Sequence, residues 1–275
     1  MSAVPSLTPL VAAYDHVLLD LDGCVYVGDE ATPGAVQALA ALRAAGKGIA
    51  FVTNEGRRSG EEFVRKLWSL GFRASLEEVV TVGGAVQHVL AERRERWRTA
   101  YVIGAPVMHQ HVLDAGCKIA NGRDVPAVPD VVVVAAHDRF DYDELRDATQ
   151  AVLGGAALIC AGADPVFPTA TGLWPGTGAV VAAVEAATGV RAENVGKPAA
   201  QPFLTALDRL GPGRALVVGD RLDSDLAGAA AAGLDGAIVL SGATGAEEAH
   251  AASDPTPVAV AATLAELVLG RMHAA

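Results

Sequence analysis

The sequence predicts an α/β protein with a parallel sheet, in which a large α/β domain is inserted into an α/β core. Three observations predict this fold class. Short apolar runs alternate with longer stretches of helical periodicity, short loops of glycine, proline and capping residues separate them, and the alternation recurs along the 275 residues. Strands and helices joined in this order form right-handed βαβ units, whose strands lie parallel in one sheet.

The first third of the chain contains two strand–helix units. The apolar run from Val17 to Leu19 predicts a buried strand. Thr32 and Pro33 are typical of an N-cap and the first residue of a helix, and Gly46 is typical of its end. The expected elements are a strand over 17–20, a helix over 34–46, a strand over 48–54 and a helix over 61–71.

The middle of the chain, from about Thr81 to Val190, repeats this alternation, and the last part returns to the first pattern. We therefore expect a core formed by residues 1–80 and 191–275 and an inserted α/β domain formed by residues 81–190. The expected elements of the insert are strands over 100–104, 130–136 and 156–162, a helix that ends at Gly116 and a helix over 141–153. Those of the last part are a strand over 214–220, a helix over 225–233 and a strand over 236–242.

The composition excludes several classes of partner. The net charge is −11, from 21 basic and 32 acidic residues, so we expect neither nucleic acid nor an anionic membrane as a partner. The uncharged stretch from Pro165 to Val184 is interrupted by prolines and glycines, which argues against a membrane span. Because Cys24, Cys117 and Cys160 form no CxxC pair and the N-terminal segment MSAVPSLTPLVAAYDH lacks the basic region of a signal peptide, we expect a cytoplasmic protein with reduced thiols.

Two aspartates stand at the end of the first predicted strand. Asp20 and Asp22 are two residues apart in HVLLDLDGCVY, and Gly23 lets the backbone turn away after them. The carboxyl end of a parallel strand is where open α/β sheets bind ligands, and two carboxylates suit Mg²⁺. A solvated turn would explain the same pair, so the remaining motifs decide between the two interpretations.

A second group of residues has the properties of a phosphate site. Thr53 and Asn54 end the second strand, where a hydroxyl and backbone N–H groups can hold phosphate oxygens. Lys197 lies in a Gly-Lys-Pro turn before a helix and offers a point charge to a phosphate. The alternatives are helix capping for Thr53 and Asn54 and a solvated turn for Lys197.

Three more carboxylates follow a later strand. Asp220 ends the strand over 214–220, and Asp223 and Asp225 lie in the loop after it. Acidic residues are also common at the start of a helix, which is the alternative interpretation. If these carboxylates join the first pair, their mutual repulsion requires a metal ion or a proton at the site.

The order of these motifs, DxDG, T-N, K-P and GDxxxxD, resembles that of the haloacid dehalogenase (HAD) superfamily of phosphotransferases. The closer resemblance is to its NagD-like branch (HAD subfamily IIA), related to 4-nitrophenylphosphatases. The segments that carry it are GDRLDSD, VTN with RRS, the stretch GADPVFPTATGLWPGTGA and the GKP that follows. The resemblance implies a HAD-like Rossmannoid core with an α/β cap inserted between the second and third motifs.

The resemblance also implies roles for matching residues. Asp20 would be the nucleophile that forms an aspartyl phosphate, and Asp22 the general acid and then the general base. Thr53 and Lys197 would bind the phosphoryl oxygens. The implied ligands of Mg²⁺ are Asp20, the backbone carbonyl of Asp22, and Asp220, with Asp225 in support.

Five residues are candidates for substrate or phosphate contact: Asn54, Glu55 and Arg57 after the second strand, and Phe167 and Trp174 in the cap. Relatives of this branch usually read T-N-N-S where this chain has Glu55. Facing the site, Glu55 would disfavour a second anionic group on the substrate. Turned outward, it would pair with Arg57 or Arg58. For Phe167 and Trp174, core packing and substrate contact both remain open.

These observations predict a Mg²⁺-dependent phosphatase that hydrolyses a small phosphomonoester, such as a sugar, polyol or related metabolite phosphate, through an aspartyl-phosphate intermediate. A phosphomutase could use the same motifs, and a protein that only binds a phosphorylated metabolite could retain them. The expected partner is a small phosphorylated metabolite. Caps of this size in relatives often carry a dimer interface, so we also expect a homodimer formed through the cap.

Overall fold

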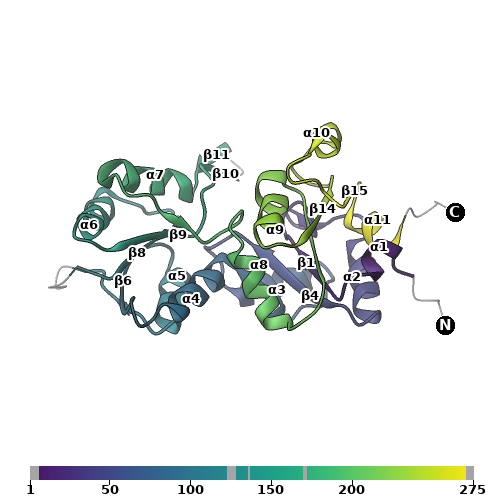
Figure 1. Ribbon diagram of the computed structural model, residues 1–275, viewed down its shortest axis with the longest axis horizontal. Helices are drawn as coiled ribbons and strands as arrows, with labels where there is room; N and C mark the ends of the chain where they lie inside the picture. The colour runs from purple at the N-terminus through teal and green to yellow at the C-terminus, as the bar shows by residue number, and fades with distance from the viewer. Residues whose placement is uncertain (1–5, 123–127, 136, 170–171, 271–275) are drawn as a thin grey trace. The chain divides into compact units, whose positions relative to one another are not determined.

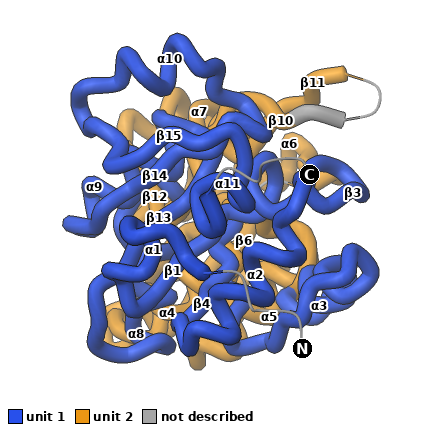
Figure 2. The backbone as a smooth tube through the Cα atoms, turned by 90° about the vertical axis from the view of Figure 1, so that its right-hand side faces the viewer, with its two compact units in different colours: residues 1–53, 60–80, 197–275 blue, residues 54–59, 81–196 orange. Residues whose placement is uncertain are grey.

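Two parallel sheets form the frame of the fold, one in each of two units of the chain (Figures 1 and 2). The structure is a computed structural model, and it describes residues 6–122, 128–135, 137–169 and 172–270. Unit 1 comprises Met1–Thr53, Gly60–Val80 and Lys197–Ala275, and unit 2 comprises Asn54–Ser59 and Thr81–Gly196. The predicted α/β fold class with an inserted α/β segment is confirmed.

The helices and strands of unit 1 come from both ends of the chain. Those of the first part are α1 (Pro9–Ala12), β1 (His16–Leu19), β2 (Tyr26–Val27), β3 (Glu30–Ala31), α2 (Ala35–Ala44), β4 (Gly48–Thr53), α3 (Gly60–Ser69), η1 (Leu76–Glu78) and β5 (Val79–Thr81), whose last residue belongs to unit 2. Those of the last part are α8 (Gln201–Leu210), β13 (Ala215–Gly219), the π turn η2 (Leu222–Leu226), α9 (Ala227–Ala231), β14 (Asp235–Val239), α10 (Ala246–Ala251), β15 (Ala259–Ala261) and α11 (Leu264–Leu269).

The sheet of unit 1 has the order β15-β14-β13-β1-β4-β5, so β1 lies between β4 and β13. Both of these neighbours pair with β1 in parallel, and Leu19 is in register with Phe51 and with Val218. Side chains of β1 alternate between two hydrophobic clusters: Val17 and Leu19 belong to one, and Leu18 belongs to the other. A strand buried on both faces explains why the sequence shows a continuous apolar run here.

Unit 2 repeats this architecture with a sheet of its own, in the order β12-β9-β8-β6-β7. Its elements are α4 (Val82–Glu92), β6 (Thr99–Ile103), α5 (Pro106–Asp114), β7 (Lys118–Ile119), β8 (Val131–Val134), α6 (Tyr142–Leu153), β9 (Ala157–Cys160), β10 (Val166–Thr169), β11 (Gly172–Pro175), α7 (Thr177–Thr188) and β12 (Glu193–Asn194). The four valines of β8 alternate between a cluster packed with α4 and α5 and a cluster packed with α6 and α7. Strands β10 and β11 form a separate antiparallel hairpin.

The boundaries of the two units differ in part from the domain boundaries expected from the sequence. The inserted domain was expected over 81–190, and unit 2 begins at Thr81 but continues to Gly196 and also takes in Asn54–Ser59. The chain thus passes between the units directly after Thr53 and directly before Lys197. Of the predicted insert strands, 130–136 corresponds to β8, and residue 136 lies outside the described residues. Within the described part of the chain, no helix is long and apolar enough to cross a membrane.

Candidate active site

Strand β1 places Asp20 at the carboxyl edge of the unit 1 sheet. The backbone N–H of Asp20 donates to the carbonyl oxygen of Val218 at 2.9 Å, which continues the pairing with β13 by one residue. The chain then turns, with Gly23 at φ +91°, a conformation that glycine adopts without strain. Asp20 is only 9% exposed, whereas Asp22 in the turn is exposed to solvent. The two aspartates therefore occupy different environments.

Two neighbouring strands bring further polar residues to the same edge. Thr53 is the last residue of β4, and Asp220 follows the last residue of β13. Because β4 and β13 both lie parallel to β1, their carboxyl ends meet beside Asp20. Thr53 and Asp220 are both buried, whereas residues that only cap a solvated helix end would be exposed.

Lys197 joins two of the carboxylates. Its Nζ donates to Oδ1 of Asp20 at 2.5 Å and to Oδ1 of Asp225 at 2.6 Å, and it lies 3.3 Å from the carbonyl oxygen of Val52. Lys197 is 4% exposed and Asp225 is 2% exposed. The interpretation of Lys197 as a solvated turn residue is therefore wrong, because its ammonium group is buried against two carboxylates.

Burial and charge shift the proton affinities of this cluster. Burial raises the pKa of Asp20 to about 8, and the carboxylates of Asp225 and Asp220 add to the shift while Lys197 opposes it. Burial also raises the pKa of Asp220. Burial alone would lower the pKa of Lys197, but the charges of Asp20 and Asp225 outweigh it and the pKa is raised. The lysine therefore stays charged, and ionisation of all three carboxylates would leave two negative charges that it cannot balance, which is why protons are held more tightly here.

The donor set fits a magnesium ion. One ligand oxygen from each of Asp20, Asp220 and Asp225 lies within 4.8 Å of the others, the only such group of three found among the described residues. These donors are all carboxylate oxygens, as Mg²⁺ prefers, and a divalent cation would balance the two negative charges left after Lys197. The side chain of Asp22 is not part of this group. Its backbone carbonyl remains a proposed ligand.

The loop after β14 also contacts the cluster, which the sequence did not indicate. The backbone N–H of Ala243 donates to Oδ2 of Asp220 at 2.6 Å. This contact joins positions 23 residues apart. The segment LSGATG contains no carboxylate, lysine or histidine, so nothing in its residue types indicated a contact with the carboxylate cluster.

The loop after Thr53 carries a local ion pair. Oε1 of Glu55 accepts from the backbone N–H of Arg57 at 2.7 Å and from its Nε at 3.2 Å, and Oε2 lies 3.1 Å from its Nη2. Arg57, one of the two partners that the sequence left open, therefore pairs with Glu55. Hydrogen bonding to Glu55 is the main reason that the pKa of Arg57 is raised. Asn54, the first residue of this loop, lies beside Gly196 in unit 2.

Two further residues of unit 2 hold the Arg57 guanidinium. Its central carbon lies 4.3 Å from the centre of the Phe167 ring, and Nη1 lies 3.7 Å from Oδ1 of Asp138. Phe167 pairs across the β10–β11 hairpin with Trp174, and their rings meet edge to face at 6.5 Å. Trp174 is 45% exposed, so it is not a residue of the hydrophobic core. The hairpin residues 170 and 171 lie outside the described residues.

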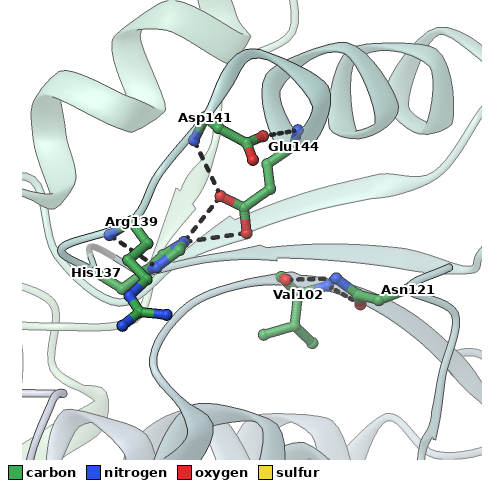
Figure 3. A network of polar contacts seen from close by, with 6 residues as sticks. All are labelled: Val102, Asn121, His137, Arg139, Asp141 and Glu144. Atoms are coloured by element: carbon green, nitrogen blue, oxygen red, sulfur yellow. Dashed lines mark hydrogen bonds and ion pairs between the residues drawn. The ribbon is translucent and has the colours of Figure 1, made fainter.

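The loop that carries Asp138 is fixed at the start of α6. Oε2 of Glu144 lies 2.9 Å from Nε2 of His137 and accepts from the backbone N–H of Asp141 at 3.2 Å, two of the contacts drawn as dashed lines in Figure 3. In return, the side chain of Asp141 accepts from the backbone N–H of Glu144, which completes a capping box. Asp138 follows His137 directly, so this network supports the contact with Arg57.

Two family profiles match the chain. The first describes a haloacid dehalogenase-like hydrolase and matches residues 17–118, and the second is described as HAD-hydrolase-like and matches residues 194–267. Between them they contain Asp20, Thr53, Lys197 and the GDRLDSD segment.

Among characterised proteins, D-glycerol 3-phosphate phosphatase of Mycobacterium tuberculosis is 38% identical over 236 residues, which cover 86% of this chain and 65% of that enzyme. This chain thus spans less than two thirds of that relative's length. Acid sugar phosphatase of Staphylococcus aureus is 32% identical over 237 residues, which cover 86% of this chain and 90% of that enzyme.

Solved structures show the same fold over nearly the whole chain. A glycerol phosphate phosphatase of M. tuberculosis in complex with magnesium has a TM-score of 0.86 at 37% identity, covering 94% of this chain and 78% of that one. NagD from Escherichia coli K-12 has a TM-score of 0.82 at 27% identity, covering 92% of this chain and 97% of that one.

Proposed function

We propose a Mg²⁺-dependent phosphatase activity for this chain, which belongs to the haloacid dehalogenase-like hydrolases and to their NagD-like branch. The observation that carries the proposal is the buried cluster in which Lys197 joins Asp20 to Asp225 and Asp220 lies within ligand distance. Such a cluster is costly to bury unless a ligand uses its charges. The chemistry that matches it is transfer of a phosphoryl group to a carboxylate beside a divalent cation.

In the first step, a carboxylate oxygen of Asp20 attacks phosphorus, and the bond from phosphorus to the ester oxygen breaks. Lys197 contributes a positive charge beside Asp20, which reduces repulsion between the carboxylate and the phosphoryl oxygens. Thr53, at the end of the adjacent strand, is the proposed hydroxyl donor to those oxygens. Asp22 gives its proton to the leaving oxygen, so the product leaves as an alcohol.

In the second step, Asp22 takes a proton from water, and the water oxygen attacks phosphorus. The bond between Asp20 and phosphorus breaks, which releases inorganic phosphate and restores the carboxylate. Asp22 thus loses one proton to the leaving oxygen and regains one from the attacking water, and its exposed position leaves it accessible to that water. A bound Mg²⁺, held by Asp20, Asp220 and the backbone carbonyl of Asp22 with Asp225 in support, would neutralise charge on the phosphoryl oxygens.

The proposed substrate is a small sugar or polyol phosphate. The relatives described above are named a D-glycerol 3-phosphate phosphatase and an acid sugar phosphatase, which supports this class. Unit 2 is the proposed cap, and Asn54, Glu55, Arg57, Phe167 and Trp174 are its proposed contacts with the substrate. A homodimer formed through unit 2 remains a prediction from the sequence.

The test is phosphate release from a panel of phosphomonoesters with Mg²⁺ or with EDTA. The panel contains sugar phosphates, glycerol phosphates and 4-nitrophenyl phosphate, and Asp20→Asn protein purified in parallel controls for contaminating phosphatases. We expect release that requires Mg²⁺ and is lost in the variant. No release from any compound, or equal release in EDTA, would contradict the proposal. Transfer of the phosphoryl group to another sugar would indicate a phosphomutase.

A further inference from the structure

The loop after β14, residues 240–245 (the β14 loop), lies against Asp220 and against the turn that follows Asp20. Besides the bond from Ala243 N–H to Asp220 Oδ2 at 2.6 Å, the backbone N–H of Thr244 donates to the Asp220 carbonyl oxygen at 3.2 Å. The Ser241 hydroxyl donates to the carbonyl oxygen of Gly23 at 2.7 Å, across 218 residues of sequence. The loop therefore connects two segments of the site that are far apart in the chain.

Two glycines enclose the Asp220 carboxyl group. A Cβ added at Gly242 would overlap Oδ2 and Cγ of Asp220 and would lie 2.6 Å from its Cβ. A Cβ added at Gly23 would also overlap Oδ2 and would lie 2.5 Å from Cγ and 3.0 Å from Oδ1. No carbon can approach these atoms so closely. The carboxyl group thus occupies a space that exists only because both positions lack a side chain.

We propose that the β14 loop is a positioning element for a metal ligand, with Gly242 and Ala243 fixing the carboxylate of Asp220. Oδ2 is held by the Ala243 N–H between the two glycines, which fixes the orientation of the whole carboxyl group and therefore of the oxygen that it would offer to a cation. Mg²⁺ requires near-ideal octahedral geometry and short ligand distances, so it is sensitive to the orientation of each carboxylate. Groups that orient metal ligands from outside typically contribute 10–100-fold to metal affinity. The inference rests on the proposed Mg²⁺ site.

A purely structural role makes a different prediction. If the Ala243 bond served only to satisfy a buried carboxylate, perturbing it would lower the stability of the metal-free protein and leave the intrinsic affinity for Mg²⁺ unchanged. A positioning role changes the affinity itself. Mg²⁺ binding to the protein without substrate therefore separates the two, and it does not depend on turnover.

The main variant is Gly242→Ala, and Gly245→Ala is its matched control. Both positions lie in the β14 loop, neither has a positive φ, and a Cβ at Gly245 meets nothing within 4 Å. Isothermal titration with MgCl₂ should give about 10–100-fold weaker binding for Gly242→Ala and unchanged binding for Gly245→Ala. Circular dichroism in EDTA would show that both variants are folded.

Ser241→Ala gives a second test without adding an atom to the site. It removes the bond to the Gly23 carbonyl oxygen, which ties the loop to the turn, and should weaken Mg²⁺ binding several-fold. This variant keeps the inference falsifiable if Gly242→Ala does not fold. Unchanged Mg²⁺ affinity in the folded Gly242→Ala protein, or in Ser241→Ala when Gly242→Ala is unfolded, would overturn it, as would equal weakening by Gly245→Ala.

The same titration distinguishes failure of the inference from failure of the proposed function. A wild-type protein that binds Mg²⁺ and a Gly242→Ala protein that binds it equally well would remove the positioning role and leave the phosphatase proposal intact. A wild-type protein that binds no Mg²⁺ at millimolar concentration would overturn the metal site and this inference together.

Discussion

Replacing Lys197 with methionine should reveal how strongly the site depends on one buried cation. Lys197→Met keeps the length of the side chain but removes the charge that lies 2.5 Å from Asp20 and 2.6 Å from Asp225. Removing one partner of a buried ion pair typically costs about 3–5 kcal/mol, because the other charges are left without compensation. The loss of folding stability has an upper limit, because a carboxylate left without Lys197 can take up a proton instead. Taking up that proton costs about 1.4 kcal/mol per unit of pH above the ordinary pKa of the carboxyl group.

This limit makes the effect depend on pH. At pH 7.5, we expect Lys197→Met to lower the stability of metal-free unit 1 by about 3–5 kcal/mol. At pH 5, protonation of a carboxylate costs only about 1–2 kcal/mol, so the loss should shrink to that size. Hydrogen exchange of the β1 and β13 amides in EDTA measures this, because it reports the opening of unit 1 separately from unit 2.

Lys47→Met is the matched control. Nζ of Lys47 also makes two hydrogen bonds, but it donates to the backbone carbonyl oxygens of Ala12 and Tyr14 at the protein surface. Its loss should cost about 1 kcal/mol and should not vary between pH 5 and 7.5. A Lys197→Met protein that matches the control in size and in pH dependence would refute the argument that Lys197 compensates buried carboxylates.

Two other predictions concern Asp20 and Glu55. Because burial raises the pKa of Asp20 from 3.8 to about 8, the folded metal-free protein keeps a proton that the unfolded chain has lost, so its free energy of unfolding, measured by urea titration in EDTA, should fall as pH rises across that range. Urea titrations with saturating Mg²⁺ should show a flatter pH profile, and parallel profiles would contradict the assignment. Glu55→Asn should raise the ratio of kcat/KM for phosphoglycolate to kcat/KM for glycerol phosphate by roughly tenfold. The effect is no larger because Arg57 already offsets part of the repulsion between Glu55 and an anionic substrate. Equal changes in kcat/KM for both compounds would show that Glu55 does not select the substrate.

Much of the fold could be predicted from the sequence because its strands are buried on both faces. Continuous apolar runs mark β1, β4, β13 and β8, and each was expected within one or two residues of its observed bounds, apart from residue 136. The candidate site followed from the same pattern, because parallel strands bring their carboxyl ends to one edge. Asp20 and Asp220 therefore lie close together although 200 residues separate them.

Other features depend on contacts that no local pattern encodes. The helix expected from Asp225 begins earlier, with a π turn at Leu222, because the backbone N–H of Arg221 and the ammonium of Lys197 both bond the Asp225 carboxylate. The β14 loop has no carboxylate, lysine or histidine, and its proposed role depends on contacts with Asp220 and with Gly23, which lies 218 residues from Ser241 in the sequence. Arg57 pairs with Glu55, and its guanidinium also contacts Asp138 and Phe167, which lie much later in the chain and which no pattern around Glu55 could indicate.

The most direct test of the proposed mechanism is to locate the phosphoryl group during turnover. Wild-type enzyme mixed with Mg²⁺ and 4-nitrophenyl phosphate, quenched in acid within the first turnover and digested, should yield a phosphorylated peptide whose modified residue is Asp20. The Asp20→Asn protein, treated in the same way, should yield none. Phosphate release by Asp20→Asn at the wild-type rate, or a phosphoryl group found on another residue, would contradict the assignment of Asp20 as the nucleophile.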